Sequence, residues 1–389
     1  MNLKQKQFLD TYIGLPLVYL HIALARLLGF ILRRNHHVEQ APNEICIIKL
    51  LGFGSVIMAS DALYSLKVKY PDARLTIICS KSIEEGIRSI RLFETVYVID
   101  DRNFFRLVCS SLATVARLQR RRRLWIADLE VYSKLTGILS AWTLALNRFG
   151  FYFNQVPFRY NLYTHHVYFN TVINVEDNYE EMVRAMGVTA ITPYTIKGFP
   201  PRQQGKAYTY IALNNTCSEL ARERRLTDAQ LQALCSELLR LTPYKIALLG
   251  APSDREANEQ FLDSHNFDRA QITNIAGQYE FEAYYRFLYE ECALMVTIDS
   301  APLHIANKLN IPNLSIWGPT SPQSRIDLNT ANEYLYLGVN CSPCAHFVDK
   351  LPCGGDNFCI KNITTAPIIN KIQKLLLLYS GHDTDKTFL

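Results

Sequence analysis

The chain has 389 residues, 49% of them hydrophobic, and its 41 lysines and arginines against 36 aspartates and glutamates leave a net charge of +5. This length and composition predict two globular domains and exclude a disordered, collagen-like or disulfide-scaffolded miniature protein. A charge this small, spread over the whole chain, does not favour nucleic acid as a partner.

The first predicted element is an apolar helix over residues 12–32, in which His21 and Arg26 are the polar exceptions. No small-residue cleavage site follows it, so we expect no cleaved signal peptide. Arg26 favours a helix lying in the membrane interface over one that spans, because it and two arginines after the helix can meet anionic head groups there. Residues 1–40 are therefore predicted to form a membrane-associating helix; the alternative is a helix packed on the protein itself.

Strands and helices then alternate over residues 41–195, which predicts an N-terminal, Rossmann-like α/β domain with a parallel, doubly wound sheet. The predicted strands are residues 44–51, 74–79, 95–99 and 124–128, and the predicted helices are residues 56–70, 83–90, 104–119 and 133–146.

The alternation begins afresh after a boundary between residues 187 and 206 that contains prolines and glycines. The predicted strands are residues 208–213, 245–249, 294–298 and 313–316, and the predicted helices are residues 227–241, 281–291 and 302–308. Residues 206–375 are thus predicted to form a second Rossmann-like domain. In paired sheets of this kind ligands bind at the carboxyl ends of the strands, which we expect to lie in a cleft between the halves.

The strongest local signal lies between Thr297 and Pro322. Asp299 and Ser300 follow a strand directly and precede a short helix, so backbone amides at the helix start can form an anion site suited to a diphosphate. The alternative is an ordinary helix cap, with His304 packed as a satisfied histidine. Near the N-terminus, Gly52-Phe53-Gly54-Ser55 also opens a helix, but it lacks the third glycine of a dinucleotide site and does not favour a nicotinamide enzyme.

Four of the ten cysteines gather in the segment 341–359: Cys341, Cys344, Cys353 and Cys359. Thiols at this spacing, separated by prolines and glycines, predict a structural zinc or iron site; free or packed thiols and disulfides are the alternatives. None of these interpretations makes the cluster catalytic.

The chain resembles glycosyltransferase family 9, the heptosyltransferases of lipopolysaccharide synthesis, over about residues 44–375. Several of the segments described above carry this resemblance. The segments that carry the resemblance are Gly52–Ser55, Asp128-Leu129-Glu130, Asn214-Asn215-Thr216, Gly250-Ala251, Ala276-Gly277 and Asp299–Pro322. The most specific is Asp299-Ser300-Ala301-Pro302-Leu303-His304 with Gly318-Pro319-Thr320, which is similar to the family's Asp-Thr-Gly-x-x-His … Gly-Pro-Thr signature.

The resemblance implies a glycosyltransferase-B architecture that needs no catalytic cofactor or metal. The C-terminal domain would hold a nucleotide-activated sugar, typically ADP-heptose, and the N-terminal domain a lipid-linked glycan acceptor. Asp299 would meet the donor sugar. The other donor-side residues by resemblance are Ser300, Ala301, His304 and Gly318, with Asn214, Asn215 and Thr216 at the phosphates, Arg224 or Arg225 against the leaving diphosphate and Glu256 at the ribose.

The chain departs from the family at Ser55, where the family has the aspartate thought to be the general base. A serine hydroxyl does not accept a proton at neutral pH, so another carboxylate is required, or the acceptor differs, or activity is lost. The nearest carboxylates in sequence are Asp61, Asp128 and Glu130, with Glu130 just past a strand end. Gly52, Gly54 and Lys134 are the remaining residues expected on the acceptor side.

The sequence therefore predicts an inverting, metal-independent glycosyltransferase, membrane-associated at the cytoplasmic face of the bacterial inner membrane, that moves heptose from a nucleotide diphosphate to lipopolysaccharide or a related glycan. Two alternatives remain. One is another sugar-nucleotide enzyme, such as a UDP-sugar transferase or an epimerase. The other is a catalytically silent binding protein that kept the donor fold.

Overall fold

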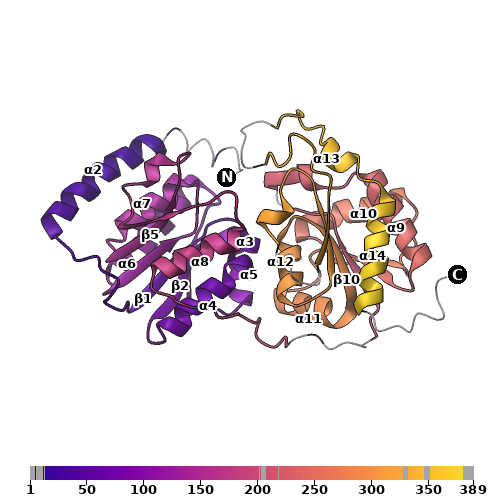
Figure 1. The fold of residues 1–389 in the computed structure, drawn as a ribbon, viewed down its shortest axis with the longest axis horizontal. Helices are drawn as coiled ribbons and strands as arrows, with labels where there is room; N and C mark the ends of the chain where they lie inside the picture. Colours follow the sequence, from indigo (N-terminus) through magenta and orange to yellow (C-terminus); the bar gives the residue numbers. More distant parts are fainter. Residues whose placement is uncertain are drawn as a thin grey trace. The chain divides into compact units, whose positions relative to one another are not determined.

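The computed structural model describes residues 14–200, 202, 207–217, 219–326, 332–345 and 351–379, together with Gln5 and Tyr12. The chain divides into two compact units, Met1–Tyr194 and Thr195–Leu389. Each unit contains one six-stranded parallel sheet with helices packed on it (Figure 1). The predicted α/β class with two doubly wound sheets is confirmed.

The first unit joins its strands in the order β3-β2-β1-β4-β5-β6. These strands are β1 (Glu44–Ile48), β2 (Arg74–Ser80), β3 (Thr95–Ile99), β4 (Leu124–Asp128), β5 (Asn147–Tyr152) and β6 (His165–Tyr168). Its helices are α2 (Gly14–Leu32), α3 (Phe53–Met58), α4 (Ser60–Lys69), α5 (Glu84–Ser89), α6 (Phe104–Gln119), α7 (Lys134–Trp142) and α8 (Val175–Ala185), with short 3-10 turns η2 (Lys81–Ile83) and η3 (Pro157–Arg159).

The second unit repeats this arrangement with the order β12-β11-β10-β7-β8-β9. Its strands are β7 (Tyr210–Asn214), β8 (Lys245–Leu248), β9 (Ile272–Asn274), β10 (Cys292–Ile298), β11 (Asn313–Trp317) and β12 (Asn332–Tyr336). Its helices are α9 (Asp228–Leu241), α10 (Arg255–Ser264), α11 (Phe281–Glu291), α12 (Ala301–Lys308), α13 (Phe358–Lys361) and α14 (Thr365–Tyr379), with 3-10 turns η4 (Glu219–Arg224), η5 (Pro252–Asp254) and η6 (Pro322–Ser324).

Both sheets reverse their winding at one pair of neighbouring strands, β1 and β4 in the first unit and β7 and β10 in the second. At such a switch point the loops after the two strands diverge and leave an opening at their carboxyl ends, which is where open α/β sheets bind ligands. The register aligns Ile48 with Asp128 in one sheet and Asn214 with Thr297 in the other. The loops that carry the predicted site residues therefore start side by side.

Helix α2 packs on its own domain along one side. Val18 and Ile22 are buried in a cluster with Ile138 of α7. The helix has a mean hydropathy of 2.0 and is long and apolar enough to cross a membrane by length and composition, yet only 17% of it is buried. One side of α2 thus packs on the protein, which is one of the two arrangements expected for this segment. Most of the apolar surface of the helix is left uncovered.

Candidate active site

Asp299 lies just past the end of β10, and its carboxylate is buried against an arginine. Nη1 of Arg224 is 3.2 Å from Oδ2 of Asp299 and also donates to the Asp299 carbonyl at 3.0 Å. Burial raises the pKa of Asp299, but the charges of Arg224 and Arg325, with smaller contributions from His304 and Thr320, lower it more, so that the net pKa falls below its ordinary value. At neutral pH the second switch point therefore holds a buried carboxylate and guanidinium in contact.

The arginine in this pair is Arg224 and not its neighbour. Nη2 of Arg225 donates to the Cys217 carbonyl at 3.0 Å and lies 3.6 Å from Oδ1 of Asp254. Since Arg224 ends the η4 turn, the two side chains leave the backbone in different directions, and one-residue slips of this kind cannot be resolved from sequence. Of the two predicted arginines, the structure brings Arg224 to the aspartate.

Two asparagines at the end of β7 hold the switch-point loops in place. The Asn214 amide donates to the hydroxyls of Ser300 at 2.8 Å and Thr297 at 3.1 Å, and the Thr216 hydroxyl donates back to Asn214 Oδ1 at 3.0 Å. Asn215 exchanges two hydrogen bonds with the backbone of Leu226, at 2.8 and 3.0 Å. The side chains predicted to face phosphates are thus used within the protein, where they fix the segments that carry Asp299 and Arg224.

Helix α12 starts at this same edge. Ser300 is its N-cap residue, but the serine side chain caps no amide because it accepts from Asn214 instead. Ala301 opens the helix, and His304 is buried one turn later. Burial lowers the pKa of His304 to about 4, although the Asp299 charge opposes this effect, so the imidazole is neutral at pH 7. Positive charge here comes from Arg224 and Arg325. The start of α12 adds few free amides, because Pro302 has no N–H and the Leu303 amide donates to the Ser300 carbonyl at 3.1 Å.

Two further predicted donor residues differ in exposure. Glu256 is an exposed residue in the first turn of α10, where its Oε1 accepts from Gln260 Nε2 at 3.3 Å. Gly318 is buried in the turn after β11, and a Cβ atom there would lie 2.5 Å from Cγ1 of Ile360. The glycine thus permits close packing of the turn against α13.

The four clustered cysteines line one small cavity and are free thiols. Burial raises the pKa of Cys344 and of Cys359, so these two are neutral thiols at pH 7. Among the residues that the structure describes, no group of three or more His, Cys, Asp or Glu side chains is arranged to hold a metal ion. The predicted structural zinc or iron site is therefore not supported, and the alternative of free thiols describes these residues; disulfides are not formed.

The cysteine-containing segment instead supports the donor-site loops. The Cys344 amide donates to the Pro319 carbonyl at 3.0 Å, and the Asn357 side chain donates to the Glu223 carbonyl at 2.7 Å. Glu223 directly precedes Arg224, so Asn357 fixes the backbone from which that guanidinium extends. No pattern in the sequence marks Asn357, because its partner lies more than a hundred residues away and is a carbonyl that any residue supplies.

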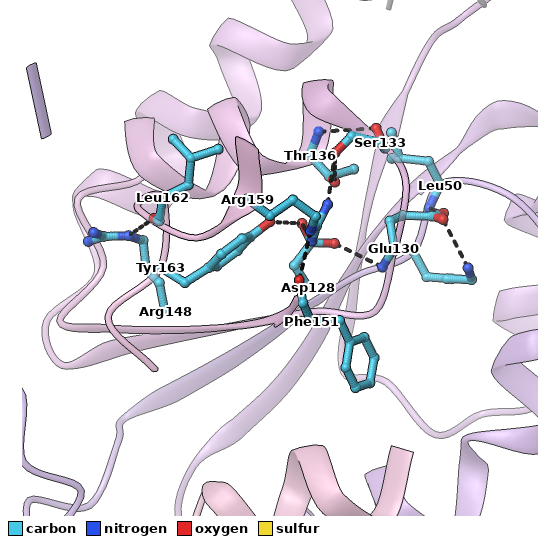
Figure 2. Close-up of polar contacts among 11 residues, drawn as sticks. Leu50, Asp128, Glu130, Ser133, Thr136, Arg148, Phe151, Arg159, Leu162 and Tyr163 are labelled. Atoms are coloured by element: carbon cyan, nitrogen blue, oxygen red, sulfur yellow. Dashed lines mark hydrogen bonds and ion pairs between the residues drawn. The ribbon is translucent and has the colours of Figure 1, made fainter. Parts of the chain in front are cut away.

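At the first switch point Glu130 binds the loop that follows β1. Its Oε1 accepts from the Leu50 amide at 2.8 Å (Figure 2). The same oxygen accepts from the Leu51 amide at 3.0 Å, and Oε2 accepts from Lys49 Nζ at 3.0 Å. Burial lowers the pKa of Lys49, but the Glu130 carboxylate raises it more, so this lysine stays charged. Glu130 keeps 14% of its side chain exposed at the edge where ligands enter folds of this kind.

Asp128 has no solvent-exposed surface. Its Oδ2 accepts from Arg159 Nη2 at 2.9 Å and from the Tyr163 hydroxyl at 2.5 Å, while its Oδ1 accepts from the Glu130 amide at 3.0 Å (Figure 2). Arg159 also donates to the carbonyls of Phe151 and Ser133. This interior position denies Asp128 the access to substrate expected of a general base, and we assign it the role of fixing the loop that carries Glu130.

Of the remaining acceptor-side residues, three lie at the start of α3 and Lys134 lies on α7. Gly52 caps this helix in the left-handed region, with a φ of 82°, Gly54 is buried and Ser55 is half-buried. Lys134 begins α7 and its Nζ lies 5.0 Å from the centre of the Phe158 ring. Asp61 lies on α4 and accepts from the Tyr194 amide at 2.5 Å, so its carboxylate is bound within the domain.

Comparison with known proteins identifies relatives over most of the chain. The family model of glycosyltransferase family 9 (heptosyltransferase) matches residues 202–354, which include Asp299 and Arg224. Lipopolysaccharide heptosyltransferase 1 of Campylobacter coli is 22% identical over 353 residues, covering 85% of this chain and 98% of that protein.

Solved structures share the fold. The E. coli ADP-heptose lipopolysaccharide heptosyltransferase II matches with a TM-score of 0.65 at 16% identity, over 86% of this chain and 99% of that one. The E. coli heptosyltransferase WaaC with ADP-2-deoxy-2-fluoro heptose matches with a TM-score of 0.61 at 15% identity, over 85% and 99%. With two sheets of the glycosyltransferase-B type and a signature similar to that of family 9 at the second switch point, the chain is a glycosyltransferase similar to the heptosyltransferases of family 9.

Proposed function

We propose that the protein transfers heptose from ADP-heptose to the core of a lipopolysaccharide, with inversion at the anomeric carbon. The observation that carries this proposal is the buried contact of Asp299 with Arg224 at the switch point of the second unit. The names of the relatives support the sugar and the glycan, and the WaaC complex with an ADP-heptose analogue supports the nucleotide.

In this mechanism the bond from the anomeric carbon to the diphosphate breaks as the acceptor oxygen attacks, and negative charge develops on the leaving ADP. Arg224 and the positive end of the α12 dipole stabilise that charge. Because they supply positive charge directly, the transfer requires no metal ion at the diphosphate. Asp299 orients Arg224 through the contact at 3.2 Å and meets the donor sugar.

The acceptor hydroxyl must lose its proton, and Glu130 is the carboxylate that we propose for this step. It lies at the first switch point and retains an exposed fraction, whereas Asp128 is fully buried against Arg159. Ser55 then contributes to binding the acceptor instead of taking the proton. A direct attack with a single displacement inverts the anomeric configuration.

The acceptor is proposed to be lipid-linked, with the protein at the cytoplasmic face of the bacterial inner membrane. Helix α2 supports this localisation, because Tyr19, Leu20, Leu27, Phe30 and Ile31 all keep more than half of their side-chain surface exposed. Exposed apolar residues beside arginines are typical of helices that lie in a membrane interface.

Nucleotide binding tests the donor assignment before any acceptor is known. We expect ADP to raise the melting temperature more than GDP, UDP or CDP, because binding to the folded state alone stabilises it. Arg224→Gln should weaken ADP binding by about tenfold or more, the loss expected when a charge-assisted hydrogen bond is removed. The matched control is Arg240→Gln, an exposed arginine paired with Glu237 on α9. Equal responses to all four nucleotides, or equal ADP binding by both variants, would contradict the assignment.

A further inference from the structure

A large groove separates α2 from the helices on which it lies. Only the first half of α2 is packed on α7, through Val18 and Ile22. Beyond that contact a cavity of about 550 Å³ opens between α2, α6 and the end of α7. Its walls are mostly apolar and include Leu24, Leu28, Leu112, Val115 and Trp142. A space of this size and character lies within the range of small-molecule sites.

The groove also contains two arginines that pair with no Asp or Glu among the described residues. Arg34 and Arg148 both line it, and no Asp or Glu is among its lining residues in the described part of the chain. Arg34 Nη1 donates to the Leu144 carbonyl at 2.5 Å, and Arg148 donates to the carbonyls of Leu162 at 3.1 Å and Ala145 at 3.3 Å. In Figure 2 the Arg148 guanidinium points away from Asp128, whose charge is already matched by Arg159.

The two guanidinium groups act on one another. Burial lowers the pKa of Arg148 to about 10; the nearby Tyr163 opposes this shift and the charge of Arg34 adds to it. His36, the other polar group beyond the end of α2, is directed to the Leu146 carbonyl by its Nδ1 and adds no negative charge. An anion placed between Arg34 and Arg148 would relieve their repulsion and replace the water lost on burial.

We propose that this groove binds one anionic phospholipid of the membrane, with an acyl chain along the apolar walls and the phosphate between Arg34 and Arg148. The ligand must cover the apolar walls and also neutralise the two arginines. A soluble phosphate would leave the walls exposed to water, and an apolar helix would leave the arginines without an anion. An anionic phospholipid meets both requirements, because it has an acyl chain and a phosphate. The position of the groove agrees with a membrane lipid as its ligand, because α2 and α6 expose further apolar side chains, among them Phe30, Phe104 and Phe105.

A short-chain lipid below its critical micelle concentration tests the groove separately from attachment to a membrane surface. We expect the full-length protein to bind dihexanoyl phosphatidylglycerol in calorimetry, with Arg34→Gln weakening the affinity by about tenfold. The matched control Arg33→Gln removes the same charge from the neighbouring residue, which stacks on Phe30 and does not line the groove, and should bind like the wild type. Dihexanoyl phosphatidylcholine should bind more weakly than phosphatidylglycerol.

A second variant fills the groove without removing charge. Ala116 lines it from α6, whereas Ala113 is exposed on the same helix and does not line it. Ala116→Trp should therefore abolish binding of the short-chain lipid, and Ala113→Trp should leave it unchanged.

No binding by the wild type, or equal binding by the members of either pair, would overturn the proposal. Binding of an acylated, phosphorylated glucosamine disaccharide but not of phosphatidylglycerol would overturn it in favour of the acceptor. Nucleotide binding is independent of all these outcomes, so failure here leaves the proposed transferase function standing.

Discussion

At the residue scale, the role of a charged side chain follows from its burial and its partners more than from its type. Asp128 and Glu130 stand two positions apart, and the sequence made both of them potential bases. The chain leaves β4 directly after Asp128, so Asp128 stays inside against Arg159 while Glu130, in the loop, reaches the Leu50 amide. Arg159 and Tyr163 were not predicted as functional residues, because their partner lies on a strand about thirty positions earlier.

His304 allows a test of the electrostatics around Asp299 by pH. Its pKa is about 4 in the folded protein against 6.5 ordinarily, so between these values the unfolded chain binds a proton that the folded protein does not. The free energy of unfolding must therefore fall as the pH falls through this window, by on the order of 3 kcal/mol from this group alone. Denaturant unfolding at pH 7 and pH 4 should show a smaller acid-induced loss for His304→Gln than for the wild type. The exposed His37→Gln variant is the control; a loss identical in all three proteins would contradict a buried, neutral His304.

At the scale of elements, periodicity predicted most of the strands, including the edge strand β3, but missed the inner strand β5 and the strands β6, β9 and β12. Strands such as β1 and β4 are buried throughout and appear in the sequence as short apolar runs. The edge strands β6 and β12 are only partly buried and carry polar and aromatic residues, so no periodic pattern marks them. Helices α8 and α10 were missed for a related reason, since each buries only a few side chains.

A prediction about elements concerns the segment that contains the clustered cysteines. If its hydrogen bond from Asn357 supports η4, then Asn357→Ala should free the Glu223 carbonyl and loosen the position of Arg224. We expect weaker ADP binding, by less than the loss in Arg224→Gln, with the overall fold retained in circular dichroism. Asn362→Ala changes the same residue type at the exposed end of α13 and should bind ADP normally. Wild-type ADP affinity in Asn357→Ala would show that this hydrogen bond does not position the arginine.

At the scale of the whole molecule, the chain repeats one topology in two units. The strand order places a switch point in each unit, with Glu130 at the first and Asp299 at the second. The sequence predicted this division because a second run of alternating strands and helices starts after residue 206. It did not predict the groove beside α2, which depends on how a helix packs on partners more than eighty residues away.

The most direct test of the central claim is heptose transfer from ADP-heptose to a lipopolysaccharide core that lacks heptose, followed by mass spectrometry of the glycan. The wild type should add one heptose, and Asp299→Asn should lose transfer while remaining folded. Asp263→Asn serves as the matched control, because Asp263 also pairs with an arginine, Arg269, but on the exposed surface of α10. Transfer by the wild type and by Asp263→Asn but not by Asp299→Asn is the predicted result. Undiminished transfer by Asp299→Asn, or no transfer by the wild type, would contradict the account.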